Sequence, residues 1–260
     1  MIPFELGKDT TIWIIGASSG IGRGLARKLS ENVKEVFVSA RSKEPLLDLA
    51  GKASNITPLV ADLADRTSLE RQLDRIEKQC GLPDLVIINA AVYQSLPTQA
   101  ITPELVQQHL EVNLLGPAQL AALLLPKMLS DPSRERALVF VASVAGYRGL
   151  PNAGFYGATK AGLISYAESL RGELQGSAVR IQVINPGFVD TPMTRENTFP
   201  MPFLMTVDEA VARIIKGLKG QAFEITFPRR LSWTLKCLRL LPYSLFFRIT
   251  RKLRPGEKAE

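Results

Sequence analysis

The chain has 260 residues, 46% of them hydrophobic, which is enough for one sizeable core and leaves little room for a second domain. Its formal net charge of +7 at first suggests a nucleic-acid partner. However, eight basic residues and no acidic residue fall between positions 229 and 254, so the rest of the chain carries about −1. Because the basicity belongs to one tail, and no aromatic platform accompanies it elsewhere, we expect no nucleic-acid partner.

The cysteines and the apolar runs indicate the compartment. Residues 1–8 lack the basic and apolar regions of a secretory signal. The longest uncharged run near the C-terminus, Leu240–Phe247, is far below the roughly 18 residues of a transmembrane helix. Cys80 and Cys237 occur in unrelated contexts without a ligand cluster nearby. We therefore expect a cytoplasmic protein with neither a disulfide framework nor a metal site.

Short apolar runs alternate with longer helical patterns along the chain, which predicts a parallel sheet covered on both faces. Strands are predicted at Thr11–Ile15, Glu35–Ser39, Ile56–Val60, Leu85–Asn89, Ala137–Ala142, Arg180–Ile184 and Phe223–Phe227. Helices are predicted at Ile21–Ser30, Ser68–Cys80, Pro103–Leu129, Phe155–Gly176 and Val207–Lys219. The third of these continues through Gly116 and Pro117, where we expect a kink. The order predicts one doubly wound α/β domain of Rossmann type over residues 1–228.

A glycine-rich loop directly follows the first predicted strand. Glycines permit a tight turn and close backbone approach, and the start of the next helix offers free N–H groups to a pyrophosphate. A turn that binds no ligand would also explain the glycines, but their place between the first strand and the first helix favours a dinucleotide site. The loop residues are Gly16, Ser18, Ser19, Gly20, Ile21 and Gly22.

The end of the second predicted strand indicates which dinucleotide binds. An acidic residue at this place selects a free ribose 2′-hydroxyl, but here Ala40 is followed by Arg41. A guanidinium suits a 2′-phosphate, so we expect NADP(H). The alternative is that Arg41 is only a solvated residue at a strand end.

Tyr156 and Lys160 lie four residues apart on a predicted helix, so their side chains share one face. A neighbouring ammonium, together with a positive nicotinamide, would favour the phenolate and make Tyr156 usable as an acid or base near neutral pH. Ser143 ends the fifth predicted strand, at the edge where sheet ligands bind. Taken alone, the Tyr–Lys pair is usually a surface contact and the serine the start of a turn.

In combination, these motifs make the chain similar to the short-chain dehydrogenase/reductase family from about residue 10 to residue 227. Further matches are Asp62 and Leu63 for an adenine contact, Asn89 and Ala90 for the motif that steadies the central sheet, Asn113 for a catalytic tetrad with Ser143, Tyr156 and Lys160, and Pro186, Gly187, Val189 and Thr191 for the segment over the nicotinamide. Ile15 and Ala91 depart from the usual residues of two motifs. The resemblance implies an oxidoreductase that interconverts a carbonyl and an alcohol.

The resemblance implies that Tyr156 exchanges the proton with the substrate oxygen, which Ser143 orients. Lys160 would lower the pKa of the tyrosine and hold the nicotinamide ribose, and Asn113 would anchor a proton relay through water. We expect reduction as the working direction. Two alternatives stay open: a 3-oxoacyl carrier reductase of fatty-acid metabolism and a catalytically idle NADP-binding sensor or scaffold. The resemblance also suggests a homodimer or homotetramer formed through the helices at Pro103–Leu129 and Phe155–Gly176.

The connection after the sixth predicted strand, Phe188–Met205, has the position of a lid beside the ligand crevice. Its apolar residues are Phe188, Val189, Phe199, Pro200, Met201, Pro202, Phe203, Leu204 and Met205. An apolar lid favours a lipophilic carbonyl or alcohol substrate over a sugar. Proline and methionine in a loop can equally be core contacts.

Residues 229–260 form a basic, amphipathic C-terminal extension, and Pro242 divides its apolar part into two short predicted helices. Three interpretations compete. Residues 229–254 could lie on an anionic membrane surface, which would make the protein peripheral to a membrane. They could instead cover the substrate pocket and a dimer partner, or attract an acidic carrier protein.

Overall fold

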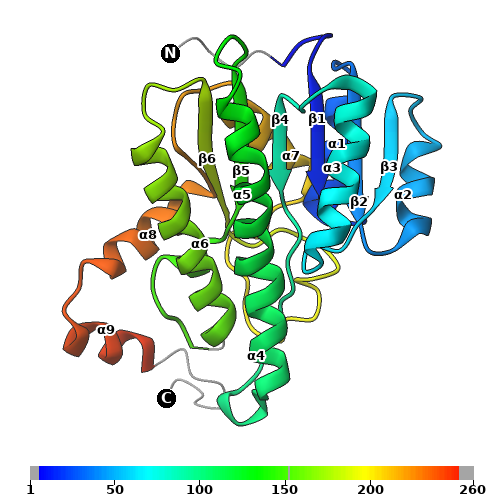
Figure 1. The fold of residues 1–260 in the computed structure, drawn as a ribbon. Helices are drawn as coiled ribbons and strands as arrows, with labels where there is room; N and C mark the ends of the chain where they lie inside the picture. Colours follow the sequence, from blue (N-terminus) through cyan, green and yellow to red (C-terminus); the bar gives the residue numbers. More distant parts are fainter. Residues whose placement is uncertain (1–5, 152, 252–260) are drawn as a thin grey trace.

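The computed structural model describes residues 6–151 and 153–251. Seven parallel strands form one sheet in the order β3-β2-β1-β4-β5-β6-β7, with helices on both faces (Figure 1). The strands are β1 (Thr11–Ile15), β2 (Glu35–Ala40), β3 (Ile56–Val60), β4 (Leu85–Ile88), β5 (Arg136–Val141), β6 (Val179–Pro186) and β7 (Glu224–Phe227). The predicted doubly wound Rossmann-type sheet is confirmed, and the chain reverses direction across the sheet between β3 and β4.

Nine helices and three short helical turns accompany the strands in the described part of the chain, and the last two helices follow β7. The helices are α1 (Gly20–Ser30), α2 (Lys43–Ala50), α3 (Arg66–Cys80), α4 (Pro103–Leu110), α5 (Gly116–Leu129), α6 (Gly154–Glu173), α7 (Val207–Leu218), α8 (Arg229–Arg239) and α9 (Tyr243–Thr250). The turns are η1 (Thr98–Ala100), η2 (Glu111–Leu115) and η3 (Val144–Gly146). The sequence prediction missed α2, because this segment is short and carries Pro45, which the first helical turn tolerates.

The core has two halves, one on each face of the sheet. β1 shows how the pleat divides them: Trp13 and Ile15 pack with α3, α5 and α6, whereas Ile12 and Ile14 pack with α1, α2 and α7. All four side chains are almost completely buried. Because both faces are covered, the strand reads as a continuous apolar run in the sequence.

The predicted long helix is continuous over Pro103–Leu129, and its irregularity is the π-helical turn η2 just before Gly116. A side chain at Gly116 would lie 2.3 Å from the Leu63 carbonyl oxygen, so this position is a close packing contact. By length and composition alone this helix could cross a membrane. Its apolar residues Leu120 and Leu124 are fully buried in the core, which accounts for its composition.

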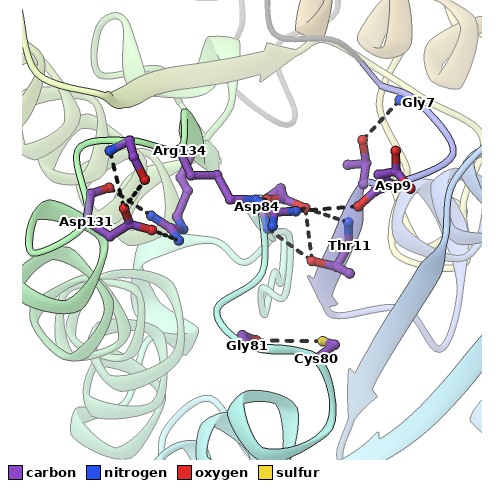
Figure 2. A network of polar contacts seen from close by, with 11 residues as sticks. Gly7, Asp9, Thr11, Cys80, Gly81, Asp84, Asp131 and Arg134 are labelled. Atoms are coloured by element: carbon purple, nitrogen blue, oxygen red, sulfur yellow. Dashed lines mark hydrogen bonds and ion pairs between the residues drawn. The ribbon is translucent and has the colours of Figure 1, made fainter.

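The amino-terminal edge of the sheet holds a buried carboxylate, Asp84, which is 4% exposed and precedes β4 (Figure 2). Its Oδ2 atom accepts hydrogen bonds from the Thr11 backbone N–H at 2.8 Å and the Thr11 hydroxyl at 3.1 Å. Arg134 donates from Nη2 to the same oxygen at 2.8 Å and from Nε to Oδ1. A buried charge is tolerated here because it is paired and fully hydrogen-bonded.

The tail folds as the two short helices expected on either side of Pro242. α8 packs against β7 and contributes Leu235 to the core. In Figure 1, α8 and α9 are the outermost elements beyond β6 and α6.

Candidate active site

The glycine loop is shaped by contacts that leave no room for side chains. Gly16 has φ +90°, and a Cβ there would lie 2.4 Å from the backbone nitrogen of Ala90. A Cβ at Gly22 would lie 2.1 Å from the Gly16 carbonyl oxygen, which also accepts a hydrogen bond from Asn89 Nδ2 at 2.7 Å. The loop therefore turns tightly at the amino end of α1, with Asn89 holding it to β4.

One cleft at the carboxyl edge of the sheet collects nearly all the predicted cofactor residues. It is lined by Gly16, Ser18, Ser19, Gly20, Ile21, Arg41, Asp62, Leu63, Asn89, Ala90, Ser143, Tyr156, Lys160, Pro186, Gly187, Val189 and Thr191. Two predicted residues do not line it. Gly22 lies behind the loop, and the Asn113 side chain is completely buried.

Ser143, Tyr156 and Lys160 meet at one side of this cleft. Ser143 follows β5, where its hydroxyl accepts a hydrogen bond from Ala145 N–H at 3.1 Å and forms a hydrogen bond with Tyr156. Lys160 is 1% exposed, donates from Nζ to the Val141 carbonyl at 2.9 Å, and places Nζ 5.7 Å from the Tyr156 ring centroid. The four-residue spacing on α6 brings the phenol and the ammonium to the same place.

Burial governs how these groups ionise. It raises the pKa of Tyr156 to about 12, which the hydrogen bond with Ser143 only partly offsets. Burial also lowers the pKa of Lys160 to about 7. The sequence argument expected Lys160 to lower the pKa of Tyr156, but in the protein alone burial raises this pKa and Ser143 is the group that lowers it. A cationic ring beside the phenol would act in the opposite direction.

Asn113 positions the segment after β4. Its Oδ1 accepts from the Val92 N–H at 2.8 Å, and its Nδ2 donates to the Val92 carbonyl at 2.9 Å and to the Thr159 hydroxyl at 3.3 Å. It lies in the π-helical turn η2, so one side chain joins this turn, the β4 segment and α6. The sequence signal located Asn113, but its buried side chain holds the cleft-lining residue Val92 and does not itself line the cleft.

The far end of the cleft holds Arg41 and Asp62. Arg41 is exposed at the end of β2, and no residue in the described ranges pairs with its guanidinium. Asp62 Oδ1 accepts a hydrogen bond from Ala64 N–H at 3.0 Å, which fixes the turn after β3. A cation with no partner among the described residues therefore lies at this end of the cleft.

Sequence reasoning missed a small hollow on the other side of Tyr156. It is lined by Gln94, Leu96, Ile101, Leu105, Val106, His109, Ala153, Gly154, Phe155 and Tyr156. Tyr93 packs edge-on against Tyr156, with ring centroids 4.8 Å apart, and donates to Asn197 Oδ1 at 2.9 Å. The position of Tyr93 shortly after β4, at the ligand-binding edge, is the signal that could have found it.

Some residues of the predicted lid, Phe188–Met205, are buried in the core, and others pack on one another or line the cleft. Val189 and Met205 pair through a β-bridge and are buried in the core, so the alternative of core contacts holds for them. Phe188 and Phe199 pack edge-on with centroids 6.0 Å apart. Met193, which was not predicted, lines the cleft.

Comparison with known proteins points to one family. Residues 10–200 match the family model described as short chain dehydrogenase. An uncharacterized oxidoreductase of Myxococcus xanthus is 35% identical over 94% of this chain and 97% of its own. A short chain dehydrogenase of Burkholderia cenocepacia in complex with NADP has a TM-score of 0.81 at 26% identity, covering 93% of this chain and 98% of that one.

A 3-ketoacyl-(acyl-carrier-protein) reductase of Brucella melitensis complexed with NADH has a TM-score of 0.78 at 22% identity, covering 86% of this chain and 99% of that one, which shows a shared fold. The match to the family model spans most of the chain and contains the glycine loop, Ser143, Tyr156 and Lys160. The protein belongs to the short-chain dehydrogenase family and is an oxidoreductase.

Proposed function

We propose that this oxidoreductase uses NADPH to reduce a lipophilic ketone or aldehyde. The observation that carries the proposal is the convergence of Ser143, Tyr156 and Lys160 on one side of the cleft, with the glycine loop on the other. Gly16, whose Cβ would meet the Ala90 backbone, lets the loop turn tightly into the start of α1, where free N–H groups suit a pyrophosphate. When bound, the nicotinamide supplies the hydride that reduces the carbonyl carbon.

The protein groups handle the proton and the orientation. Tyr156 donates its phenolic proton to the carbonyl oxygen, while the Ser143 hydroxyl donates a hydrogen bond that holds this oxygen in place. Lys160 is almost fully buried beside them and would hold the nicotinamide ribose. The high pKa of Tyr156 keeps the phenol protonated before the reaction, which suits reduction.

The unpaired Arg41 supports NADPH over NADH. Structures of the family bind either cofactor, so the choice depends on this chain's own residues. An Arg41→Asp variant replaces the cation with a charge that repels a 2′-phosphate, and we expect NADPH affinity to fall at least about tenfold. NADH affinity would change little or rise. A variant that keeps the preference for NADPH would contradict the role of Arg41.

The hollow beside Tyr156 supports a lipophilic substrate. Leu96, Ile101, Leu105, Val106 and Phe155 give it an apolar wall, and it adjoins the phenol that meets the substrate oxygen.

The test is turnover by the purified protein, with NADPH and with NADH, on ketones and aldehydes of rising chain length. We expect turnover that prefers NADPH and rises with chain length. Tyr93→Phe is a matched control for Tyr156→Phe, because the two rings touch but only Tyr156 meets Ser143. Equal activity on small polar ketones would contradict the lipophilic substrate. Tight NADPH binding without turnover would support the alternative of a catalytically idle sensor. Turnover restricted to 3-oxoacyl thioesters would support the alternative of a 3-oxoacyl carrier reductase.

The proposal extends to assembly and compartment. The unpaired thiols of Cys80 and Cys237 suit a reducing cytoplasm. A homodimer or homotetramer would cover Leu110, Leu115 and Leu129, which are exposed along the helix Pro103–Leu129. Light scattering during size-exclusion chromatography tests this, and Leu115→Asp should yield smaller particles. A monomeric wild-type protein at micromolar concentration would contradict it.

A further inference from the structure

The inner faces of the two tail helices are already filled. On α8, Leu235 is buried, and Leu231 and Leu238 pack against the core. Lys236 forms an ion pair with Glu224 on β7. On α9, Phe246 is buried. These contacts fix the inner side of the tail on the core. The exposed residues on its outer side are not needed for this packing.

Arg148, from the loop after η3, fixes the junction between the helices. Its Nη1 donates to the carbonyls of Arg239 and Leu241, each at 2.9 Å, and also to that of Leu238. The guanidinium carbon lies 3.9 Å from the Phe246 ring centroid and 5.2 Å from that of Tyr243. The orientation of both helices is thus set by the body of the protein.

The exposed side of the two helices carries large apolar and aromatic residues among polar ones. Trp233 is 67% exposed and Leu240 84% exposed, and their seven-residue spacing puts them on one side of α8. On α9, Phe247 is 61% exposed and stacks on the exposed Tyr243 at 5.8 Å. We call the exposed residues Trp233, Leu240, Tyr243, Leu245, Phe247 and Ile249 the outer apolar face. On α9, Tyr243 and Phe247 lie on one side of the helix and Leu245 and Ile249 on the other, with Arg248 between them. Several large exposed apolar side chains in one place indicate an interaction site.

Positive charge flanks this face. Arg229, Arg230, Arg239, Arg248 and Arg251 are exposed, and none forms an ion pair with another residue that the structure describes. No acidic residue occurs between positions 229 and 254 to neutralise them. Amphipathic helices with aromatic residues outward and arginines beside them match an anionic bilayer, where the rings enter the interface and the cations meet phosphate headgroups.

The tail also lies beside the cleft. A Cβ at Gly187, which lines the cleft, would lie 2.8 Å from the Leu231 side chain of α8. Tyr147, four residues after Ser143, donates to Glu224 Oε1 at 2.5 Å, the carboxylate that Lys236 pairs with. The inner side of α8 therefore packs directly behind one wall of the cleft.

We infer that α8 and α9 dock the protein on anionic lipid bilayers through the outer apolar face and its flanking arginines. The inference is independent of the proposed function, because it uses neither the cofactor nor the substrate. An acidic protein and a second copy of this chain are the competing occupants.

Trp233 offers a direct readout, since the chain has two tryptophans and Trp13 is completely buried. The full-length protein is titrated with vesicles of phosphatidylcholine, with and without phosphatidylglycerol. We expect co-sedimentation and a blue shift of tryptophan emission with the anionic vesicles, both weakened by added salt. An unchanged spectrum with no co-sedimentation would overturn the inference.

Two variants separate the apolar from the electrostatic part. Leu240→Ser with Phe247→Ser should abolish the blue shift, and Arg239→Gln with Arg248→Gln and Arg251→Gln should lower vesicle affinity about fivefold per arginine, about a hundredfold in all. The matched control, Leu47→Ser with Arg71→Gln on α2 and α3, changes residues of equal exposure class and should bind as the wild type does.

The remaining outcomes overturn the inference and identify the other occupants. Binding to poly-glutamate without binding to vesicles would indicate an acidic protein. A blue shift that grows with protein concentration in the absence of lipid, and is lost in Leu240→Ser with Phe247→Ser, would indicate a second copy. Because all variants alter exposed side chains, unchanged melting temperatures exclude misfolding as the cause.

Discussion

At the amino-terminal edge of the sheet, the Asp84 carboxylate receives hydrogen bonds from Thr11 and a two-point contact from Arg134. At the carboxyl edge, the equally buried Lys160 ammonium donates to one backbone carbonyl, that of Val141. An ammonium has three donors, so its needs are only partly met there. The first edge is built for stability, whereas the second keeps polar groups available and accepts perturbed pKa values for that purpose.

The largest expected effect lies at the carboxyl edge. Tyr156→Phe removes the proton donor, so we expect turnover to fall by about 10² to 10⁴. The free energy of unfolding should change by less than about 1 kcal/mol, because only one hydrogen bond, with Ser143, is lost. Steady-state kinetics and urea denaturation measure the two quantities. Turnover near the wild-type level would remove Tyr156 from the chemistry.

The converse change is Asp84→Ala at the amino edge. It leaves Thr11 N–H without its acceptor and Arg134 without its partner, and we expect the free energy of unfolding to fall by about 3 kcal/mol. Turnover per folded molecule should stay within about twofold, because the site lies at the other edge. Asp9→Ala, an exposed carboxylate nearby, is the control for charge alone. Equal losses in both variants would contradict the network's role.

The pH dependence of stability sharpens the contrast. Lys160 releases its proton at about pH 7 when folded but at about 10.5 when unfolded, so between these values unfolding takes up a proton. The free energy of unfolding should therefore rise with pH from about 7 toward 10, by at most about 1.4 kcal/mol per pH unit. Above pH 10 the raised pKa of Tyr156 acts in the opposite direction. Denaturation at several pH values should show this rise, and Lys160→Met should remove it. A slope that persists in Lys160→Met would contradict the assignment.

The smallest effect concerns one hydrogen bond at the amino edge. Thr11→Val keeps the shape of the side chain and the backbone N–H but loses the hydroxyl contact to Asp84 at 3.1 Å. We expect a loss of about 1 kcal/mol in unfolding free energy with unchanged turnover. Thermal melting measures it, and a loss as large as that of Asp84→Ala would mean that the hydroxyl, not Arg134, holds the carboxylate.

Local pattern determined much of this protein. Buried parallel strands need apolar residues on both faces, so the sequence predicted all seven, and a glycine loop between β1 and α1 indicated the dinucleotide site. The four-residue spacing of Tyr156 and Lys160 likewise predicted that both side chains lie on one face of a helix. It missed α2, whose few residues and Pro45 give a weak helical signal.

Only the tertiary structure decided how side chains far apart in sequence share space. It placed the Asn113 side chain against the cleft-lining residue Val92, 21 residues earlier. It set Tyr93 against Tyr156, and it showed that burial, only partly offset by Ser143, raises the pKa of the phenol. It also divided the tail's apolar residues between Leu235, which packs in the core, and Leu240, which faces outward. Composition and spacing carry local preferences, whereas burial, pairing and orientation arise from the packing of the whole chain.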